Sequence, residues 1–480
     1  MSFSLCLSLA LANCTVGPDY LRPEAPVPAA YKELKGWKRA VPGDDRDRGP
    51  WWAVFKDEKL DSLEPQIAIS NQTVAASEAA YRQSLALIKE TQAALFPTIT
   101  VNYNPTGFHD GASVAGGSGF STTRAISTLS ANATWDLDLW GKVRRTIESD
   151  VSGAQVSAAD IANAKLSTQS LLATAYYNLR SADALQALLD RSVNAFRRTL
   201  AITQNQYAAG TVSKADVATA LAQVLNTQSQ AINVGIQRAQ FEHAIAALIG
   251  RPPSELTIPA SPLGYKLPDI PVSVPSALLE RRPDIAAAER AMQQQNALIG
   301  AAIALYYPDV TLSGLFGFMG SGALALSLAN EVWTVGATAV QTAFDAGLRD
   351  AQVEAAMASY QQSVANYRQV VLTAFQQVED QLAAVRILAR QQVVADGAVR
   401  AAQVELDTLL NQYRAGTVAF TAVVVAQATL LSDEQSALAV RQNRFLAAVA
   451  LIEALGGGWD TAELPNNAEL ETLNPIIPKL

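Results

Sequence analysis

Residues that build metal centres are scarce in this sequence. It contains two cysteines, Cys6 and Cys14, and two histidines, His109 and His243. Both cysteines lie within the first fourteen residues and the histidines are far apart, whereas zinc sites need grouped Cys and His ligands. No phosphate-binding loop, nucleophile triad or cofactor motif is present either. We therefore expect no metal, no cofactor, no catalytic residues and no enzyme activity.

Clustered positive charge and long apolar runs are also missing. Only 17% of the residues are charged, the formal net charge is −8, and no basic run occurs. These features argue against nucleic-acid binding, which needs clustered Lys and Arg. No stretch approaches the roughly 18 consecutive apolar residues of a membrane helix. If the chain spans a membrane, it must do so with strands closed into a barrel.

The amino terminus has the pattern of a secreted lipoprotein. An apolar core precedes Leu11-Ala12-Asn13-Cys14, which is typical of a cleavage box after which Cys14 is acylated. The alternative is an ordinary signal peptide with a chance cysteine, because Asn13 is unusual there and no Lys or Arg precedes the apolar core. A start further upstream is a second alternative. Residues 15–60 are rich in Pro, Gly and charge over much of their length, which predicts an extended tether.

A long internal repeat organises the rest of the chain. Residues 206–212, QYAAGTV, recur as residues 412–418, QYRAGTV, at an offset of 206. The same offset relates Gly141 to Gly347 and Gly250 to Gly456. Such a period is too long for a solenoid. It predicts two copies of one large unit.

Each copy contains a pair of segments that alternate apolar and polar residues. Ile99, Val101 and Tyr103 alternate with Thr and Asn, and residues 129–139 continue this period of two. Their polar positions carry Thr, Ser, Asn and Asp, which favours a transmembrane barrel with a watery lumen over a soluble sandwich. Asp136 and Asp138 fit lumen lining better than a catalytic carboxylate pair. Three tryptophans suit an interfacial aromatic girdle, with core packing as the alternative: Trp135, Trp140 and Trp333.

Four strands cannot close into a barrel. Bacterial barrels have an even number of strands, from eight upward. The chain must therefore combine its strands with those of other copies, and two copies give eight strands whereas three give twelve.

Long helices follow each strand pair. Leu189, Val193, Phe196 and Leu200 begin a spacing of four and three that continues to Tyr207, and residues 395–413 repeat it. A helix of about 65 residues spans roughly 100 Å. Gly210 and Gly416 fit helix ends in a left-handed conformation, so each unit is predicted to form a long antiparallel helical hairpin.

The chain resembles the outer-membrane efflux proteins of the TolC/OprM type, and within them the lipoprotein (NodT-like) branch. The resemblance covers nearly the whole chain. It is carried by Val16-Gly17-Pro18-Asp19-Tyr20, by Leu137-Asp138-Leu139-Trp140-Gly141-Lys142, by the two Gln-Tyr-x-x-Gly-Thr turns, and by Leu278-Leu279-Glu280-Arg281-Arg282-Pro283-Asp284-Ile285. The Arg-Arg-Pro-Asp run itself reads as a structural helix start.

The resemblance implies an α+β homotrimer. Its three chains would form a twelve-stranded β-barrel, four strands per chain, continuous with a periplasmic α-helical coiled-coil barrel. Its partners would be outer-membrane lipid, a periplasmic membrane-fusion adaptor and an inner-membrane proton-driven pump. The predicted order is signal and lipobox 1–14, tether 15–60, first repeat 61–260 (β-hairpin 98–139, helical hairpin 142–250), linker 261–282, second repeat 283–456 (β-hairpin 309–345, helical hairpin 347–455) and equatorial tail 457–480.

The resemblance also implies a gate at the helical tip, in which the family carries pore-facing aspartates. This sequence has Ala422 and Val425 at those positions, and Val418 where some members carry Arg. We therefore expect an apolar constriction at Val425 and Phe420, because hydrophobic rings bar ions by dewetting. Asp216 and Tyr413 are a candidate latch. The alternative is that Val424 and Val425 only pack the helix seam.

The function implied is export of small toxic compounds or drugs through the outer membrane. A duct for protein secretion is an alternative within the same class. A membrane-linked coiled-coil scaffold without a conducting pore is an alternative from a different class, but it leaves the strands and the signal segment unexplained.

Overall fold

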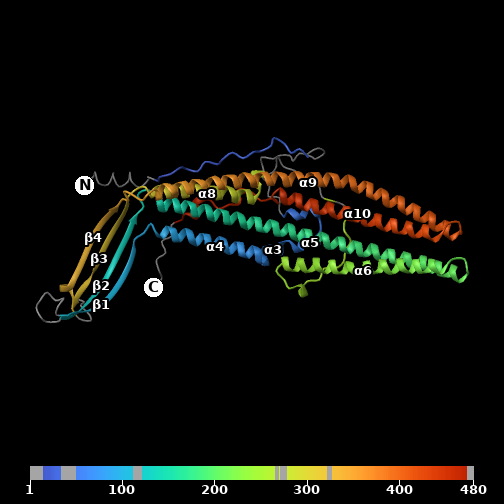
Figure 1. Cartoon of the computed structure of the whole chain (residues 1–480), viewed down its shortest axis with the longest axis horizontal. Helices are drawn as coiled ribbons and strands as arrows, with labels where there is room; N and C mark the ends of the chain where they lie inside the picture. Colours follow the sequence, from blue (N-terminus) through green and yellow to red (C-terminus); the bar gives the residue numbers. More distant parts are fainter. Residues whose placement is uncertain are drawn as a thin grey trace.

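The computed structural model describes residues 15–33, 50–111, 122–264, 267, 270, 278–321 and 327–472. Cys14, and with it the predicted acylation, lies outside the described residues. The molecule is elongated, with a sheet at one end and paired long helices along the rest (Figure 1). None of the described helices has a stretch that is long and apolar enough for a membrane span.

The two alternating segment pairs form one antiparallel sheet in the order β1-β2-β3-β4. Its strands are β1 (Thr98–Asp110), β2 (Thr122–Leu137), β3 (Asp309–Ser321) and β4 (Glu331–Val340). The hairpins of both repeats thus pair with one another through β2 and β3. Among the described residues, no strand pairs with the outer edges of β1 and β4.

The long helices of the two repeats have equal lengths. The first helix of each hairpin has 67 residues and the second has 35. A shorter helix of 22 residues precedes each strand pair. These helices are α4 (Gln72–Ala93), α5 (Lys142–Ala208), α6 (Lys214–Leu248), α8 (Pro283–Ala304), α9 (Leu348–Arg414) and α10 (Phe420–Ala454).

The short helices abut the C-terminal ends of the return helices. At the first joint the Asn71 side-chain amide donates to the Leu248 carbonyl at 2.7 Å, and at the second the Arg282 guanidinium donates to the Ala454 carbonyl at 3.0 Å. These bonds satisfy carbonyls that a helix end leaves open. In Figure 1, α4 therefore lies in line with α6, and α8 lies in line with α10.

Residues 15–33, the strap, lie extended along α8 and α9 (Figure 1). The Asn296 amide of α8 donates to the Pro18 carbonyl at 3.0 Å. The Lys32 and Glu33 backbone N–H groups donate to the Glu379 carboxylate of α9 at 2.6 and 2.9 Å. This part of the predicted tether is thus an extended segment held to the helices.

The last part of the predicted tether differs from an extended segment. Trp51 and Trp52 are buried in a core cluster with Tyr176, Tyr177 and Phe445, because large aromatic side chains gain most from burial. Helical structure therefore starts before residue 61. The shorter elements are η1 (Trp51–Phe55), α2 (Glu58–Leu63), α3 (Pro65–Ser70), η2 (Pro253–Glu255), α7 (Leu278–Arg281), η4 (Leu328–Asn330), η5 (Thr461–Glu463) and α11 (Asn467–Leu470).

Candidate functional site: the sheet faces and the helical tip

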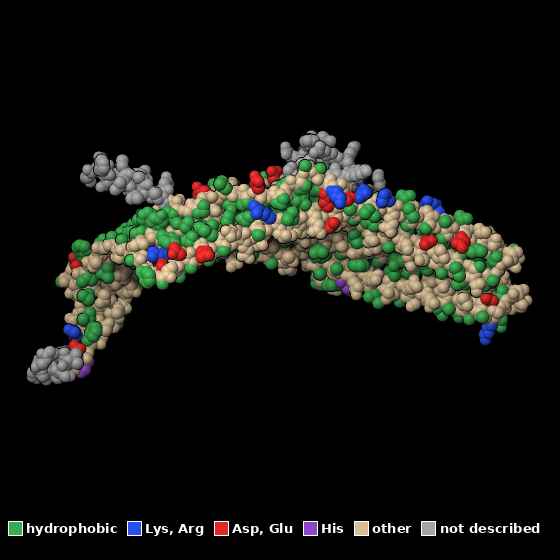
Figure 2. Space-filling model, turned by 45° about the horizontal axis from the view of Figure 1, so that its top comes forward, with side chains coloured by type: hydrophobic (Ala, Val, Ile, Leu, Met, Phe, Trp, Pro, Cys, Tyr) green, Lys and Arg blue, Asp and Glu red, His purple; other side chains and the backbone are tan. Residues whose placement is uncertain are grey.

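One face of the sheet is apolar across all four strands. The register places Val101, Ala131, Phe316 and Trp333 in one row from β1 to β4. Val101 is 72% exposed and Trp333 is 67% exposed, so this face covers no core of its own chain. Figure 2 shows hydrophobic side chains gathered over the sheet and the adjoining ends of the long helices. Such a surface fits lipid contact.

The opposite face carries hydroxyl, amide and carboxyl groups. Thr98, Thr134 and Ser313 form one row of it. In the next row the Thr311 hydroxyl donates to the Asp136 carboxylate at 2.6 Å. Asp138 instead accepts from the backbone N–H groups of Val143 and Arg144, each at 3.0 Å, at the start of α5. A polar face of this kind fits contact with water in a lumen, and Asp138 belongs to the strand–helix connection instead.

The three predicted girdle tryptophans occupy different positions. Trp135 donates its indole N–H to the Leu95 carbonyl at 2.9 Å, and Trp140 donates to the Pro308 carbonyl at 2.9 Å. Both therefore lie where the strands meet the helices. Trp333 lies within β4, on the apolar face. Exposed aromatic residues that the sequence reasoning did not single out include Phe108, Phe316 and Phe344; for Phe316 the period of two in β3 was an available signal.

The helical tip consists of two copies of the same turn. Gly210 and Gly416 have φ of 72° and 75°, a region that favours glycine. In each copy the threonine hydroxyl donates to the carbonyl of the glutamine five residues before it, at 2.9 Å for Thr211 and 3.0 Å for Thr417. The repeated sequence motif thus forms a repeated structure at the end of the molecule.

The two predicted latch residues have different partners within the chain. Asp216 forms a capping box with Ser213 at the start of α6. Tyr413 is only 4% exposed, and its hydroxyl lies 3.4 Å from the Thr203 hydroxyl. Asp216 therefore stabilises its own helix, whereas Tyr413 packs the core between α9 and its neighbours.

Phe420 was expected in the constriction and is instead a core residue. It is 4% exposed, and its ring centroid lies 5.4 Å from that of Tyr413. Its place in the first turn of α10 continues the apolar seam of α9 across the tip. A side chain buried within one chain cannot line a pore in this conformation.

Val425 differs from its neighbours on α10. Its side chain is 64% exposed, and no other large hydrophobic side chain of α10 is exposed. Val424 and Val418 pack at the edge of the tip core, and Ala422 is half-buried. Thr429, one turn further along, is exposed as well. Of the gate candidates, Val425 is therefore the hydrophobic one that faces away from the chain's own core.

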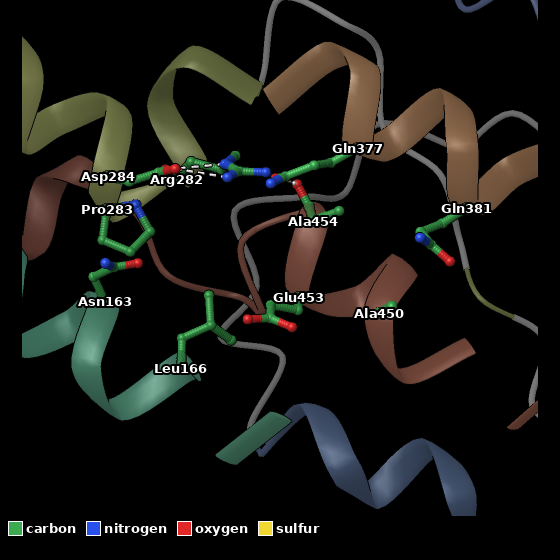
Figure 3. A pocket seen from close by; sticks show the side chains of 10 residues that line it. All are labelled: Asn163, Leu166, Arg282, Pro283, Asp284, Gln377, Gln381, Ala450, Glu453 and Ala454. Carbon is green, nitrogen blue, oxygen red and sulfur yellow. Dashed lines mark hydrogen bonds and ion pairs between the residues drawn. The ribbon is translucent and has the colours of Figure 1, made fainter. Parts of the chain in front are cut away.

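A polar cavity of about 260 Å³ lies beside the second helix joint (Figure 3). Arg282 lines it and forms a two-bond ion pair with Asp284, at 2.6 and 2.9 Å, in addition to its bond to Ala454. Glu453 accepts from the Ser170 hydroxyl. The Arg-Arg-Pro-Asp run thus holds the end of α10 to the start of α8, as a structural role requires.

The outer membrane efflux protein family matches this chain over residues 63–251 and 274–457. The chain belongs to this family. The match includes both repeats, with their strand hairpins and long helices. The chain is therefore an outer-membrane component of efflux systems.

Individual members of the family match this efflux protein over nearly its whole length. The cation efflux system protein CusC of Escherichia coli is 27% identical over 95% of this chain and 98% of its own. The toluene efflux pump outer membrane protein TtgC of Pseudomonas putida is 27% identical over 96% of each chain. Among solved structures, the outer-membrane channel OprN has a TM-score of 0.86 at 28% identity, covering 93% of this chain and 100% of its own. The open-state MtrE channel of Neisseria gonorrhoeae has a TM-score of 0.82 at 26% identity, covering 93% and 99%.

Proposed function

We propose that three copies of this chain form a conducting duct through the outer membrane. The observation that carries the proposal is the four-stranded sheet, which has two unpaired edges, one exposed apolar face and one polar face. Joining β4 of one copy to β1 of the next pairs every edge and closes a barrel of twelve strands. The apolar face then meets lipid and the polar face lines the lumen.

The cargo of the duct is small toxic compounds. Relatives of similar identity are named for export of cations, pyoverdine and toluene, so one duct architecture accompanies several cargoes. This supports selection of the cargo by an inner-membrane proton-driven pump, joined to the duct by a periplasmic adaptor. Acylation of Cys14 would anchor the chain beside the sheet, because Thr15 lies against Gly141 at the start of α5.

The duct is closed at the helical tip by Val425. In a ring of three copies, three Val425 side chains facing the lumen form an apolar constriction that excludes water and ions. Its exposure in the single chain and the burial of Phe420 support Val425 as the residue of the constriction.

Planar-bilayer recording tests the duct and its gate together. We expect the purified trimer to show low conductance, and Val425→Gly to raise the mean conductance several-fold. Thr429→Gly is the matched control, because it places the same flexible residue one turn further along α10 and should leave conductance low.

Either of two results would overturn the proposal. Silent bilayers for all three proteins, from samples shown to be folded trimers, would reject the duct in favour of a scaffold. Wild-type pores that are already open, and that conduct as much as those of Val425→Gly, would reject Val425 as the gate.

A further inference from the structure

An apolar band crosses the polar face of the sheet. Thr98, Thr134 and Ser313 lie on this face, and so does every second residue along the same strands. Toward the end of the sheet that is farthest from the helices (Figure 1), apolar side chains appear among the hydroxyl and amide groups. The apolar band consists of Phe108 of β1, Ile126 of β2, Met319 of β3 and Val332 of β4. Leu315 and Val340 are the other large apolar side chains of this face, and Leu315 adjoins the band.

The band is continuous from strand to strand. In the register of all three strand pairs, each member lies two residues away from the position directly opposite the next member. Phe108, for example, is directly opposite Arg124, and Ile126 lies two residues further along β2. Positions on this diagonal are about 7–8 Å apart, which is within reach of aromatic and long side chains. The band therefore forms one apolar strip across the whole sheet.

The band has little cover within the chain. The Phe108 side chain is 41% exposed and the Met319 side chain is 50% exposed. Connected apolar side chains on a water-facing surface commonly mark a binding surface. A barrel of about eight strands is just filled by its own side chains, so a barrel of twelve keeps open space inside. On the lumen face of such a barrel, the band lines space that a small molecule can enter.

A single cationic side chain lies beside the outer end of the band. Arg124 is the only Lys or Arg within the four described strands. Its guanidinium carbon lies 5.7 Å from the centroid of the Phe108 ring, which is a cation–π contact. The Arg124 side chain is nevertheless 65% exposed. The contact with Phe108 thus holds the positive charge next to the apolar band and leaves it open to solvent.

Asp110 is a weak partner for this guanidinium. Its carboxylate lies 3.6 Å from one guanidinium nitrogen of Arg124, and both side chains are exposed. Exposed ion pairs of this kind contribute little. Within the described residues Arg124 has no further ion pair or hydrogen bond, so most of its N–H groups are available to a ligand. The planar fork of a guanidinium matches a carboxylate through two parallel hydrogen bonds.

We infer that the apolar band and Arg124 form a binding site for small aromatic carboxylates in the lumen. The ligand ring contacts Phe108 and Ile126, and the ligand carboxylate accepts hydrogen bonds from Arg124. Apolar walls with one well-placed polar group are typical of small-molecule sites. The inference rests on the proposed duct of three copies, in which the polar face lines the lumen, and it names a class of compound that the duct binds.

Single-channel recording with 2-naphthoate tests the site in the Val425→Gly protein, whose pores we expect to be open. 2-Naphthoate added on both sides of the bilayer should interrupt the current. Arg124→Gln should raise the concentration needed for this block about tenfold, because charge-assisted hydrogen bonds are lost. Phe108→Thr should raise it about threefold, because an aromatic contact is lost. Asp110→Asn should lower it, because the competing carboxylate is removed.

Two controls separate the site from general effects on the pore. Phe316→Thr makes the same substitution on the apolar face, where Phe316 is 52% exposed, and should leave the block by 2-naphthoate unchanged. Acetate has the carboxylate without the aromatic ring. At the same concentration it should leave the current uninterrupted.

Failure of the site and failure of the duct give different results. Folded trimers that form no pores would overturn the proposed duct and the site with it. Pores that 2-naphthoate does not interrupt, or that it interrupts equally with and without Arg124→Gln and Phe108→Thr, would overturn the site and leave the duct intact. A block that acetate reproduces would overturn the assignment to aromatic ligands. Opposite effects of Arg124→Gln and Asp110→Asn, with a weaker block in Phe108→Thr, support the inference.

Discussion

At the residue scale, Glu64 is the least satisfied side chain of the described residues. It is fully buried between α2 and α3, and neither carboxyl oxygen has a hydrogen-bond partner in the part of the chain that the structure describes. Burial alone raises the pKa of Glu64 from 4.5 to about 9, because an apolar environment disfavours the charged form. The group is therefore protonated in the folded protein at neutral pH.

Replacing Glu64 with Gln should stabilise the protein increasingly as the pH rises. The folded pKa lies above the unfolded one, so the unfolded chain releases the proton from about pH 4.5 upward while the folded chain keeps it until about pH 9. Over that pH range the free energy of unfolding of the wild type falls by up to about 1.4 kcal/mol per pH unit. The melting temperature of Glu64→Gln should therefore exceed that of the wild type more at pH 8 than at pH 5.

Glu58→Gln is the control for this prediction, because Glu58 is exposed in α2, the helix that ends directly before Glu64. A difference between Glu64→Gln and wild type that is the same at both pH values would contradict the assignment. The burial of Glu64 could not be predicted from the sequence, because a Glu directly before a Pro is typical of an ordinary helix start. Phe420, by contrast, could have been placed in the core by extending the heptad spacing that includes Leu406 and Tyr413 across the turn.

At the element scale, the sequence predicted the strands and long helices because each has a single period over many residues. The period of two placed β1 and β2, and the heptad spacing placed α5 and α9. The helix joints were not predictable in the same way, because Asn71 with Leu248 and Arg282 with Ala454 are far apart in the chain. The gate candidates were predicted from the resemblance alone. The structure distinguishes Val425, whose side chain is exposed, from Phe420, whose side chain is buried.

Gly456 tests how tightly the second joint is packed. Its φ is 91°, and a Cβ there would lie 1.9 Å from the Arg281 carbonyl oxygen. Gly416 has a φ of 75° with open space around it, so Gly416→Ala measures the conformational cost alone, about 1–2 kcal/mol. We expect Gly456→Ala to lose about 1–3 kcal/mol more than Gly416→Ala, seen as a lower thermal midpoint. Equal thermal midpoints for the two variants would mean that the second joint makes room for the added methyl group without loss of stability.

At the scale of the whole molecule, the strap ties the two repeats together. Its first residues bind α5 of the first repeat through Arg145, which is 5% exposed and donates to the carbonyl groups of Val16 and Gly17 at 3.1 and 3.2 Å. Its last residues bind Glu379 of the second repeat. The contact at Gly17 is close, because a Cβ on that residue would lie 2.4 Å from the Gly300 Cα of α8.

Arg145→Ala should loosen the first half of the strap, which keeps only weaker ties such as the Asn296 bond to Pro18, and leave the second half bound. The buried guanidinium supplies three hydrogen bonds to the strap, two to its carbonyls and one to Asp19 at 3.0 Å, whereas the bonds to Glu379 are independent of it. Hydrogen–deuterium exchange read by mass spectrometry should therefore quicken in residues 16–22 and stay slow at residues 32–33. Arg144→Ala is the matched control, because Arg144 binds Asp138 in the strand–helix connection. Faster exchange along the whole strap in Arg145→Ala would show instead that the strap docks as one cooperative unit, with Arg145 holding both repeats.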